Sequence, residues 1–291
     1  MPKNRIFWLL CMLCIIIITV ITFCLIQIND RNRVINNLEG ILIYVNPRDK
    51  QSNDWVTFYN FKTKEQDFAY NFQIRGSDAC FDTGKVISIG IDSEICEFGE
   101  KDKKVLTLFR NISKQESIMQ VRYIPNDINK ISVQLGEKLY IIDTNNNQMT
   151  YLLGADNGFC WVDNKNIIYS YNGQIVRENI MTREKIIISG GYYPEISNDK
   201  QHLVFLEENN PKLLNTLVIY DLKNSVVENR FECKKVFRYR FSPDGKYIAF
   251  TQEGRKDLFF SDIELNLLDC KTGKIFRLFN DIKGSDFVWI Q

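Results

Sequence analysis

The chain has 291 residues, of which 45% are hydrophobic and 25% charged, so it is long and apolar enough to bury a substantial core. No stretch combines low hydrophobicity with high net charge, which argues against an intrinsically disordered protein. Its 37 lysines and arginines are balanced by 36 aspartates and glutamates. Phosphate binding needs a basic face, so this balance argues against nucleic acid as a partner.

The first predicted element is a transmembrane helix over residues 6–28, preceded by a short head at residues 1–5. The segment contains no charged residue and only one amide, Gln27. At about 1.5 Å per residue it reaches roughly 34 Å, enough to cross a bilayer. A cleaved signal peptide is one alternative, but Phe23 stands where cleavage needs a small residue. A lipid-modified Cys24 is another, and the permanent anchor is favoured.

The orientation of this anchor depends on the flanking charges and on the lengths of the two sides. Lys3 and Arg5 on one side are matched by Arg31 and Arg33 on the other, so the positive-inside count is a tie. A five-residue head is easier to keep in the cytoplasm than a long folded domain. We therefore expect a single-pass membrane protein with a linker at residues 29–37 and an extracytoplasmic domain, periplasmic or extracellular, at residues 38–291.

From Leu38 onward, short runs of Ile, Val, Tyr and Phe alternate with turns rich in Asn, Asp, Gly and Lys. This pattern predicts an all-β domain. One turn recurs after a β-rich run and begins with Asn or Asp, whose side chain can bond the backbone two residues on. Its copies begin at Asn60, Asp143, Asn179, Asp221 and Asp269, with a weaker one near Glu100.

A second turn follows an aromatic or aliphatic residue and is clearest in Phe241-Ser-Pro-Asp-Gly-Lys-Tyr-Ile-Ala-Phe250. Looser copies begin at Phe81, Tyr123, Trp161 and Ile196. Turns that recur every 36 to 48 residues are typical of propellers with four strands per blade. Six copies of the first turn predict a six-bladed β-propeller.

This repeat resembles that of the TolB-like β-propellers: an aromatic residue, Ser-Pro-Asp-Gly-Lys, a short β-run, and a hairpin at Asp-x-x-x-Gly. The match is strong in the last blade, moderate in the one before it, and elsewhere follows register alone. Members of that family serve as interaction scaffolds, sensor domains and non-catalytic propellers of peptidases. The resemblance therefore implies a fold much more firmly than a function.

The two ends of the domain complement each other. Residues 40–45 read as a second strand without a first, and residues 286–291 read as a first strand without a second. Pairing them would close the ring and remove exposed sheet edges. We therefore predict that the C-terminal strand completes the first blade.

The search for catalytic chemistry finds little. His202 is the single histidine, no Gly-x-Ser-x-Gly motif accompanies it, and no His or Cys cluster has metal-ligand spacing. Asp143-Thr-Asn145-Asn-Asn147 begins like a calcium loop, but Gln148 and Gly154 replace the required glycine and terminal acid. We predict no metal and no cofactor.

Acidic residues near the first-strand turns, Asp78, Asp82, Asp163 and Asp244, leave open a glycan-active enzyme with channel carboxylates. Five cysteines follow the helix: Cys80, Cys96, Cys160, Cys233 and Cys270. Small buried residues are their default interpretation, with one disulfide as the alternative.

Aligning the blades on the first-strand aromatic residue gives one candidate site. Cys80, Arg122, Cys160, Glu195, Arg240 and Val288 then occupy equivalent positions on the strands nearest the channel. Arg122, Arg240 and Arg238 are candidates for binding an anionic ligand or a partner carboxylate, with Glu195 among them. The alternative is that these arginines pair with Glu195 and join blade edges.

The leading functional hypothesis is an interaction or sensing module without catalysis, anchored in a membrane and binding a protein or peptide partner. Two alternatives stay open. One is the glycan-active enzyme, which three or more acids converging in one pocket would favour. The other is a structural subunit of an envelope complex, which a broad apolar surface would favour.

Overall fold

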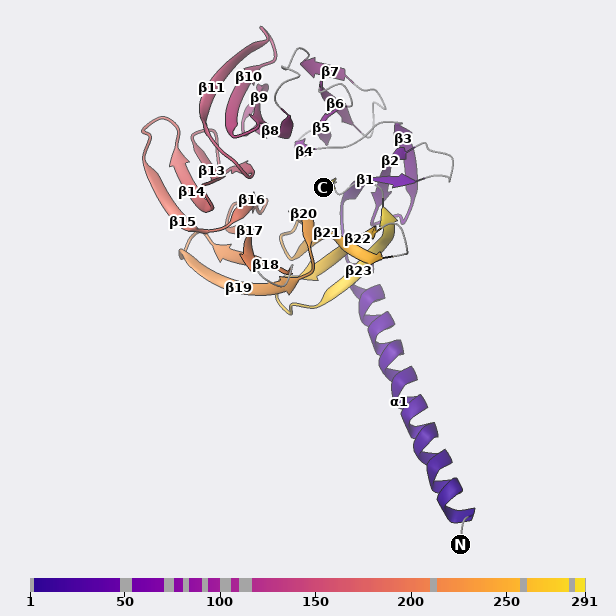
Figure 1. The fold of residues 1–291 in the computed structure, drawn as a ribbon. Helices are drawn as coiled ribbons and strands as arrows, with labels where there is room; N and C mark the ends of the chain where they lie inside the picture. The colour runs from indigo at the N-terminus through magenta and orange to yellow at the C-terminus, as the bar shows by residue number, and fades with distance from the viewer. Residues whose placement is uncertain are drawn as a thin grey trace.

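The structure is a computed structural model that describes residues 3–47, 54–70, 76–80, 84–90, 94–99, 106–109, 117–209, 214–256, 261–282 and 286–290. It consists of one N-terminal helix, α1, and six four-stranded antiparallel sheets arranged around a centre (Figure 1). The chain is thus a six-bladed β-propeller.

Helix α1 runs from Lys3 to Asn36 and leaves the propeller sideways (Figure 1). Its described apolar part is long and hydrophobic enough to cross a membrane, and no residue of that part is buried. The helix does not end at residue 28, where the hydropathy pattern stops, but continues through the stretch that the sequence indicated as linker. The cause is tertiary, because Val34 and Ile35 pack against the propeller core and Lys274 Nζ lies 2.8 Å from Asp30 Oδ2.

Each sheet forms one blade (Figure 1). The strands of each blade are given below in order from the innermost to the outermost. Blade 1 contains β24 (Phe287–Ile290), β1 (Ile41–Pro47), β2 (Asp54–Asn60) and β3 (Gln66–Tyr70). Blade 2 contains β4 (Asp78–Cys80), β5 (Lys85–Ile89), β6 (Ile95–Gly99) and β7 (Leu106–Phe109). Blade 3 contains β8 (Ile118–Ile124), β9 (Asp127–Leu135), β10 (Lys138–Asp143) and β11 (Gln148–Gly154).

The other three blades follow the same order. Blade 4 contains β12 (Phe159–Trp161), β13 (Asn166–Tyr171), β14 (Gln174–Asn179) and β15 (Lys185–Gly190). Blade 5 contains β16 (Tyr192–Ile196), β17 (His202–Asn209), β18 (Leu214–Asp221) and β19 (Val226–Cys233). Blade 6 contains β20 (Val236–Phe241), β21 (Tyr247–Lys256), β22 (Ser261–Asp269) and β23 (Ile275–Ile282).

Both predicted turns lie where the sequence placed them. The Asn or Asp turn joins the third and fourth strands, and in Asn60, Asn179, Asp221 and Asp269 the side-chain Oδ1 accepts backbone N–H groups two and three residues on. The copy of this turn near Glu100, and residues 81–83 of the second-turn copy that begins at Phe81, lie outside the described residues. The second turn joins the first and second strands, as between Phe241 and Tyr247.

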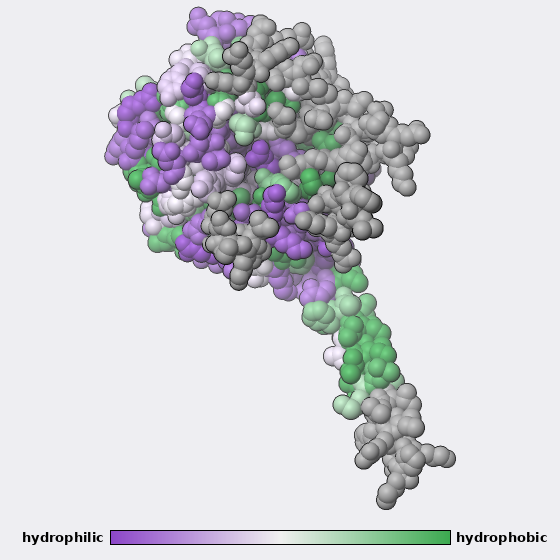
Figure 2. Space-filling model, in the orientation of Figure 1, coloured by the Kyte–Doolittle hydropathy of each residue, from purple (hydrophilic) through white to green (hydrophobic). Residues whose placement is uncertain are grey.

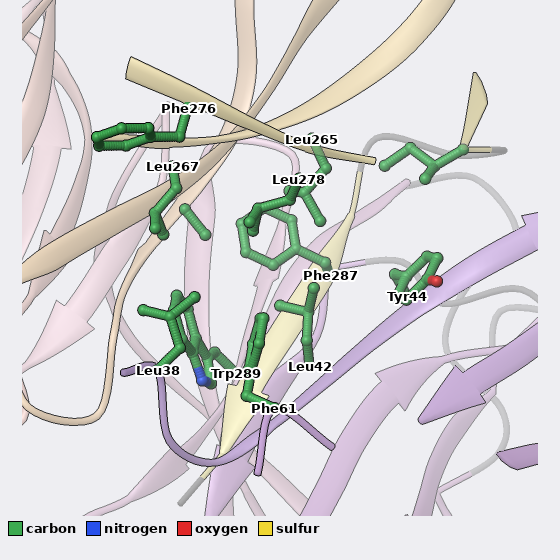
Figure 3. Packing of buried hydrophobic residues seen from close by; sticks show 12 residues of the cluster. Leu38, Leu42, Tyr44, Phe61, Leu265, Leu267, Phe276, Leu278, Phe287 and Trp289 are labelled. Carbon is green, nitrogen blue, oxygen red and sulfur yellow. The ribbon is translucent and has the colours of Figure 1, made fainter. Parts of the chain in front are cut away.

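The C-terminal strand closes the ring as predicted. Strand β24 pairs antiparallel with β1, with Trp289 opposite Leu42. Phe287 and Trp289 are buried among Leu42, Phe61 and Leu38, and Figure 3 shows these side chains packed together. Gly40 has a φ of +88° and lies against the backbone of Ile290. A Cβ atom at this position would be 2.2 Å from the Ile290 carbonyl oxygen. Only glycine fits where β1 and β24 meet.

The core lies between neighbouring blades rather than at the centre. Hydrophobic clusters join blade 2 to blade 3 and blade 5 to blade 6, for example. Cys80, Cys96, Cys160, Cys233 and Cys270 are all free thiols, so they do not form the alternative disulfide. Burial raises the pKa of Cys160, Cys233 and Cys270 to about 12, which keeps these thiols protonated and unreactive at neutral pH.

Candidate functional site: a cavity at the end of the channel

The six innermost strands, β4, β8, β12, β16, β20 and β24, all contribute residues to one cavity of about 280 Å³. It opens among the turns between first and second strands, because Asn126, Asn198, Lys200 and Ser242 of these turns line it. We call this side of the propeller the mouth face. The cavity is therefore built from the strands around the centre of the ring and from the turns that follow them.

Ionic contacts across the channel form the floor of the cavity. Arg122 Nη1 donates to Asp78 Oδ1 at 3.1 Å, and its Nη2 donates to Glu195 Oε1. Arg122 is 6% exposed. Burial alone lowers the pKa of Arg122, but the charges of Glu195 and Asp78 raise it by more, so the net shift is upward and the guanidinium stays charged.

A second arginine meets the same carboxylate from the opposite side. Arg240 Nη1 donates to Glu195 Oε1, and its Nη2 donates to the Ser77 carbonyl oxygen. Ser77 in turn donates its backbone N–H to Asp286 Oδ2 at 2.9 Å. These contacts connect the inner ends of blades 2, 3, 5 and 6, with Asp286 adding blade 1.

The ionic contacts of Arg122, Glu195, Arg240 and Asp78, called the ionic layer below, lie between two cavities. On the far side of this layer lies a small cavity of about 20 Å³, lined by residues such as Gln120, Tyr193 and Arg238. Glu195 and Arg240 line both cavities. Among the described residues, these ion pairs therefore lie between the two cavities, and the larger cavity opens among the turns of the mouth face.

Above the ionic floor the cavity has apolar walls. Ile124, Trp161, Phe241 and Trp289 line it and are themselves largely buried. Trp161 is fixed by a hydrogen bond from Nε1 to Ser132 Oγ at 2.8 Å. Ile128 also lines the cavity but is 77% exposed. A single exposed isoleucine is ordinary on a protein surface, and this one lies at the edge of the cavity.

The charges that line the cavity are compensated except at one residue. Asp78 and Glu195 pair with Arg122, and Asp127 Oδ2 lies 2.9 Å from Lys130 Nζ. Among the described residues, Lys200 is the lining cation without a carboxylate partner, and it is exposed at the mouth. The arrangement offers apolar walls and one free ammonium group.

All four residues selected from sequence lie at the channel. Arg122, Glu195 and Arg240 meet directly, which is the paired alternative given above, and Arg238 Nε lies 4.0 Å from Asp286 Oδ1. Cys160, aligned with them, is buried and does not line the cavity. The alignment missed Asp78 and Asp286. Both lie two residues before the aligned position, and alternate residues of a strand share one face.

Catalysis by the candidate acids finds no support in their contacts. Three acids line the cavity, Asp78, Asp127 and Glu195, which is the number that the glycan-active alternative asked for. Each of them, however, already has a cationic partner. Asp163 and Asp244 accept hydrogen bonds within their own turns. Asp82 lies outside the described residues.

The remaining candidates also have structural partners. His202 begins β17, and its Nε2 lies 3.6 Å from Glu228 Oε2. Asp143 Oδ1 accepts the N–H of Asn145, as in an ordinary turn. The described part of the chain contains no group of three His, Cys, Asp or Glu side chains that could hold a metal ion.

Several exposed hydrophobic residues lie away from the channel. Met149 and Tyr151 on β11 and Ile186 and Ile187 on β15 are between 44% and 60% exposed. These two outer strands belong to neighbouring blades, on the side of the propeller away from α1 (Figure 1). Single exposed hydrophobic residues are ordinary on a protein surface and do not by themselves form the broad apolar surface that the structural-subunit alternative requires.

Comparison with known proteins adds evidence on the fold. No family model and no curated protein sequence matches the chain. A crystal structure of an oligogalacturonate lyase from Vibrio parahaemolyticus is similar, with a TM-score of 0.53, 8% identity, and coverage of 82% of this chain and 79% of the other. The β-propeller domain of Cps50 (Swd1) from Myceliophteria thermophila gives a TM-score of 0.53, 12% identity, and coverage of 87% and 90%.

A luciferin-regenerating enzyme also matches, with a TM-score of 0.50, 8% identity, and coverage of 72% of this chain and 76% of the other. These proteins have unrelated roles, and their identities to this chain are very low. The likenesses therefore show the fold alone.

Proposed function

We propose that this protein is a membrane-anchored, extracytoplasmic interaction module that binds a segment of a partner protein in the cavity on the mouth face. The segment inserts an apolar side chain between Trp161 and Phe241 and places a carboxylate near Lys200. The TolB-like repeat, whose family includes interaction scaffolds, supports this role.

The observation that carries the proposal is the combination of an apolar cavity with an ionic floor whose charges are already paired. Burying an apolar side chain in such a pocket is favourable, and the ammonium group of Lys200 can recognise a negative charge. Its charged groups bind one another instead of presenting a reactive acid, base or nucleophile. These properties suit recognition better than catalysis.

Site-specific photocrosslinking in intact cells tests the proposal. A photoreactive amino acid replaces Ile128, which is 77% exposed beside the cavity, and in a control it replaces Met181, which is 73% exposed on a turn at the outer edge of blade 4. We expect a discrete crosslinked species from position 128 and none of the same size from position 181.

Charge reversal at the mouth then tests the role of Lys200. In the background of the crosslinker at position 128, Lys200→Glu should reduce the crosslinked species several-fold, because it repels the partner carboxylate. The matched control is Lys165→Glu, an exposed lysine in the equivalent turn of blade 4. Equal crosslinking from positions 128 and 181, or no effect of Lys200→Glu, would contradict the proposal.

A further inference from the structure

The end of α1 meets two turns of the propeller. Lys64, in the turn after β2, donates from Nζ to the Ile35 carbonyl oxygen at 2.8 Å. Lys274, just after the turn that follows β22, pairs with Asp30, and an Arg31 Nη2 atom lies 3.5 Å from the Leu278 carbonyl oxygen. Helix, blade 1 and blade 6 thus form one junction on the side of the propeller where the helix leaves.

This junction concentrates positive charge. We define the basic rim as the exposed cations Arg31, Arg33, Lys62, Lys64, Lys271 and Lys274. Its neighbouring carboxylates are Asp30, Glu39, Glu65 and Asp269. Asp30 pairs with Lys274 and cancels its charge, which leaves five of the six cations against the three carboxylates of Glu39, Glu65 and Asp269. Figure 2 shows the apolar surface of the helix giving way to hydrophilic residues at this junction.

The length of the helix sets the distance between the basic rim and the bilayer. The apolar run ends at Ile28, and Lys64 binds the helix at Ile35. Seven residues of helix span about 10 Å. The headgroup region is roughly 5–7 Å deep on each side, and the field of a charged surface extends about 8 Å at physiological ionic strength. The basic rim therefore lies within reach of the headgroups.

We infer that the basic rim binds the headgroups of anionic lipids in the membrane that α1 crosses, an inference that rests on the membrane anchoring proposed above. The two turns bring lysines from blades 1 and 6 to the surface beside the helix. Ile275, which follows Lys274 and is 45% exposed, adds an apolar contact at the same place. Because the junction is fixed by the contacts above, lipid binding would also fix the orientation of the propeller relative to the bilayer.

Acylation of lysines in the reconstituted full-length protein tests this inference. The protein is placed in nanodiscs of phosphatidylcholine alone, or of phosphatidylcholine mixed with phosphatidylglycerol, and a soluble acylating reagent is followed by mass spectrometry. The reagent attacks the unprotonated amine. The surface potential of an anionic bilayer concentrates protons about threefold, so acylation of Lys62 and Lys271 should fall roughly threefold or more in the anionic discs.

Lys165 is the internal control, because it is an exposed turn lysine on the mouth face of blade 4, away from α1. Its acylation should be the same in both discs, and high salt should abolish the difference at Lys62 and Lys271. The variant Lys62→Glu should weaken the protection of Lys271, whereas Lys165→Glu should leave it unchanged.

Each outcome is decisive. If the protein elutes apart from the discs, membrane anchoring fails, and the lipid contact fails with it. If the protein elutes with the discs but Lys62 and Lys271 react equally in both compositions, anchoring stands and the basic rim does not bind anionic lipid. Partner binding at the cavity is unaffected by either result and is judged by the crosslinking experiment.

Discussion

At the scale of single residues, the channel depends on Glu195, where the guanidinium groups of Arg122 and Arg240 converge. Sequence reasoning could find this trio because the repeat fixes which residue of each innermost strand faces the channel. It could not decide between a free anion site and internal pairing, because pairing depends on side-chain reach across the ring. Asp286 was missed, and Asp78 was considered only as a catalytic acid, because one position per strand was aligned. Both residues lie two positions before the aligned one, on the same face of the strand.

Removing the Glu195 charge should destabilise the protein strongly. Glu195→Gln keeps the shape of the side chain but leaves Arg240 without a carboxylate and Arg122 with only Asp78. Both arginines are largely buried, so we expect a loss of about 3 kcal/mol in the free energy of unfolding. Denaturant unfolding of the full-length protein in detergent measures it.

The control for this variant is Glu207→Gln, which breaks an exposed ion pair with Arg230 and should cost less than about 1 kcal/mol. Similar losses from the two variants would show that the channel pairs contribute no more than surface pairs.

At the scale of elements, strands and turns followed the sequence more closely than the helix did. The Asn and Asp turns are local, since each side chain bonds backbone groups within three residues, and a local signal is visible in sequence. The extension of α1 to Asn36 is not local. It depends on contacts with residues more than two hundred positions away, such as Lys274 and Leu278.

The turn carboxylates should contribute to acid sensitivity. Partial burial raises the pKa of Asp163, but hydrogen bonds from the backbone of Lys165 and from Asn166 lower it by more, so the folded-state pKa lies below 3.8. The ionised Asp163 carboxylate therefore contributes fully to the free energy of unfolding well above pH 3.8. This contribution is lost as the pH falls through the folded-state pKa of Asp163.

Asp163→Asn removes this titration. Thermal unfolding as a function of pH should show the variant less stable than the unaltered protein at neutral pH, with the difference shrinking under acidic conditions. A difference that stays constant, or grows as pH falls, would contradict the assignment.

At the scale of the whole molecule, six repeats determine a ring, and the two incomplete ends determine where it closes. This much follows from sequence because each blade carries the same turns at the same spacing. The cavity does not follow from the repeat, since it arises where unlike residues of different blades meet: Trp161, Phe241 and Lys200 stand in three different blades. Functional specificity therefore lies in the departures from the repeat.

Ring closure by β24 is the claim on which the channel, the ionic layer and the cavity all depend. The most direct test is to compare the thermal unfolding of the protein truncated after residue 285 with that of the protein truncated after Ile290. Phe287, Val288, Trp289 and Ile290 are at most 2% exposed. Burying each contributes about 1.5–3 kcal/mol, so losing all four should remove roughly 5 kcal/mol or more. That is comparable to the whole stability of many domains.

The chain truncated after residue 285 should unfold at least about 10 °C lower than the chain truncated after Ile290, or without a cooperative transition. The same cooperative transition at the same temperature in both chains would contradict the closed ring.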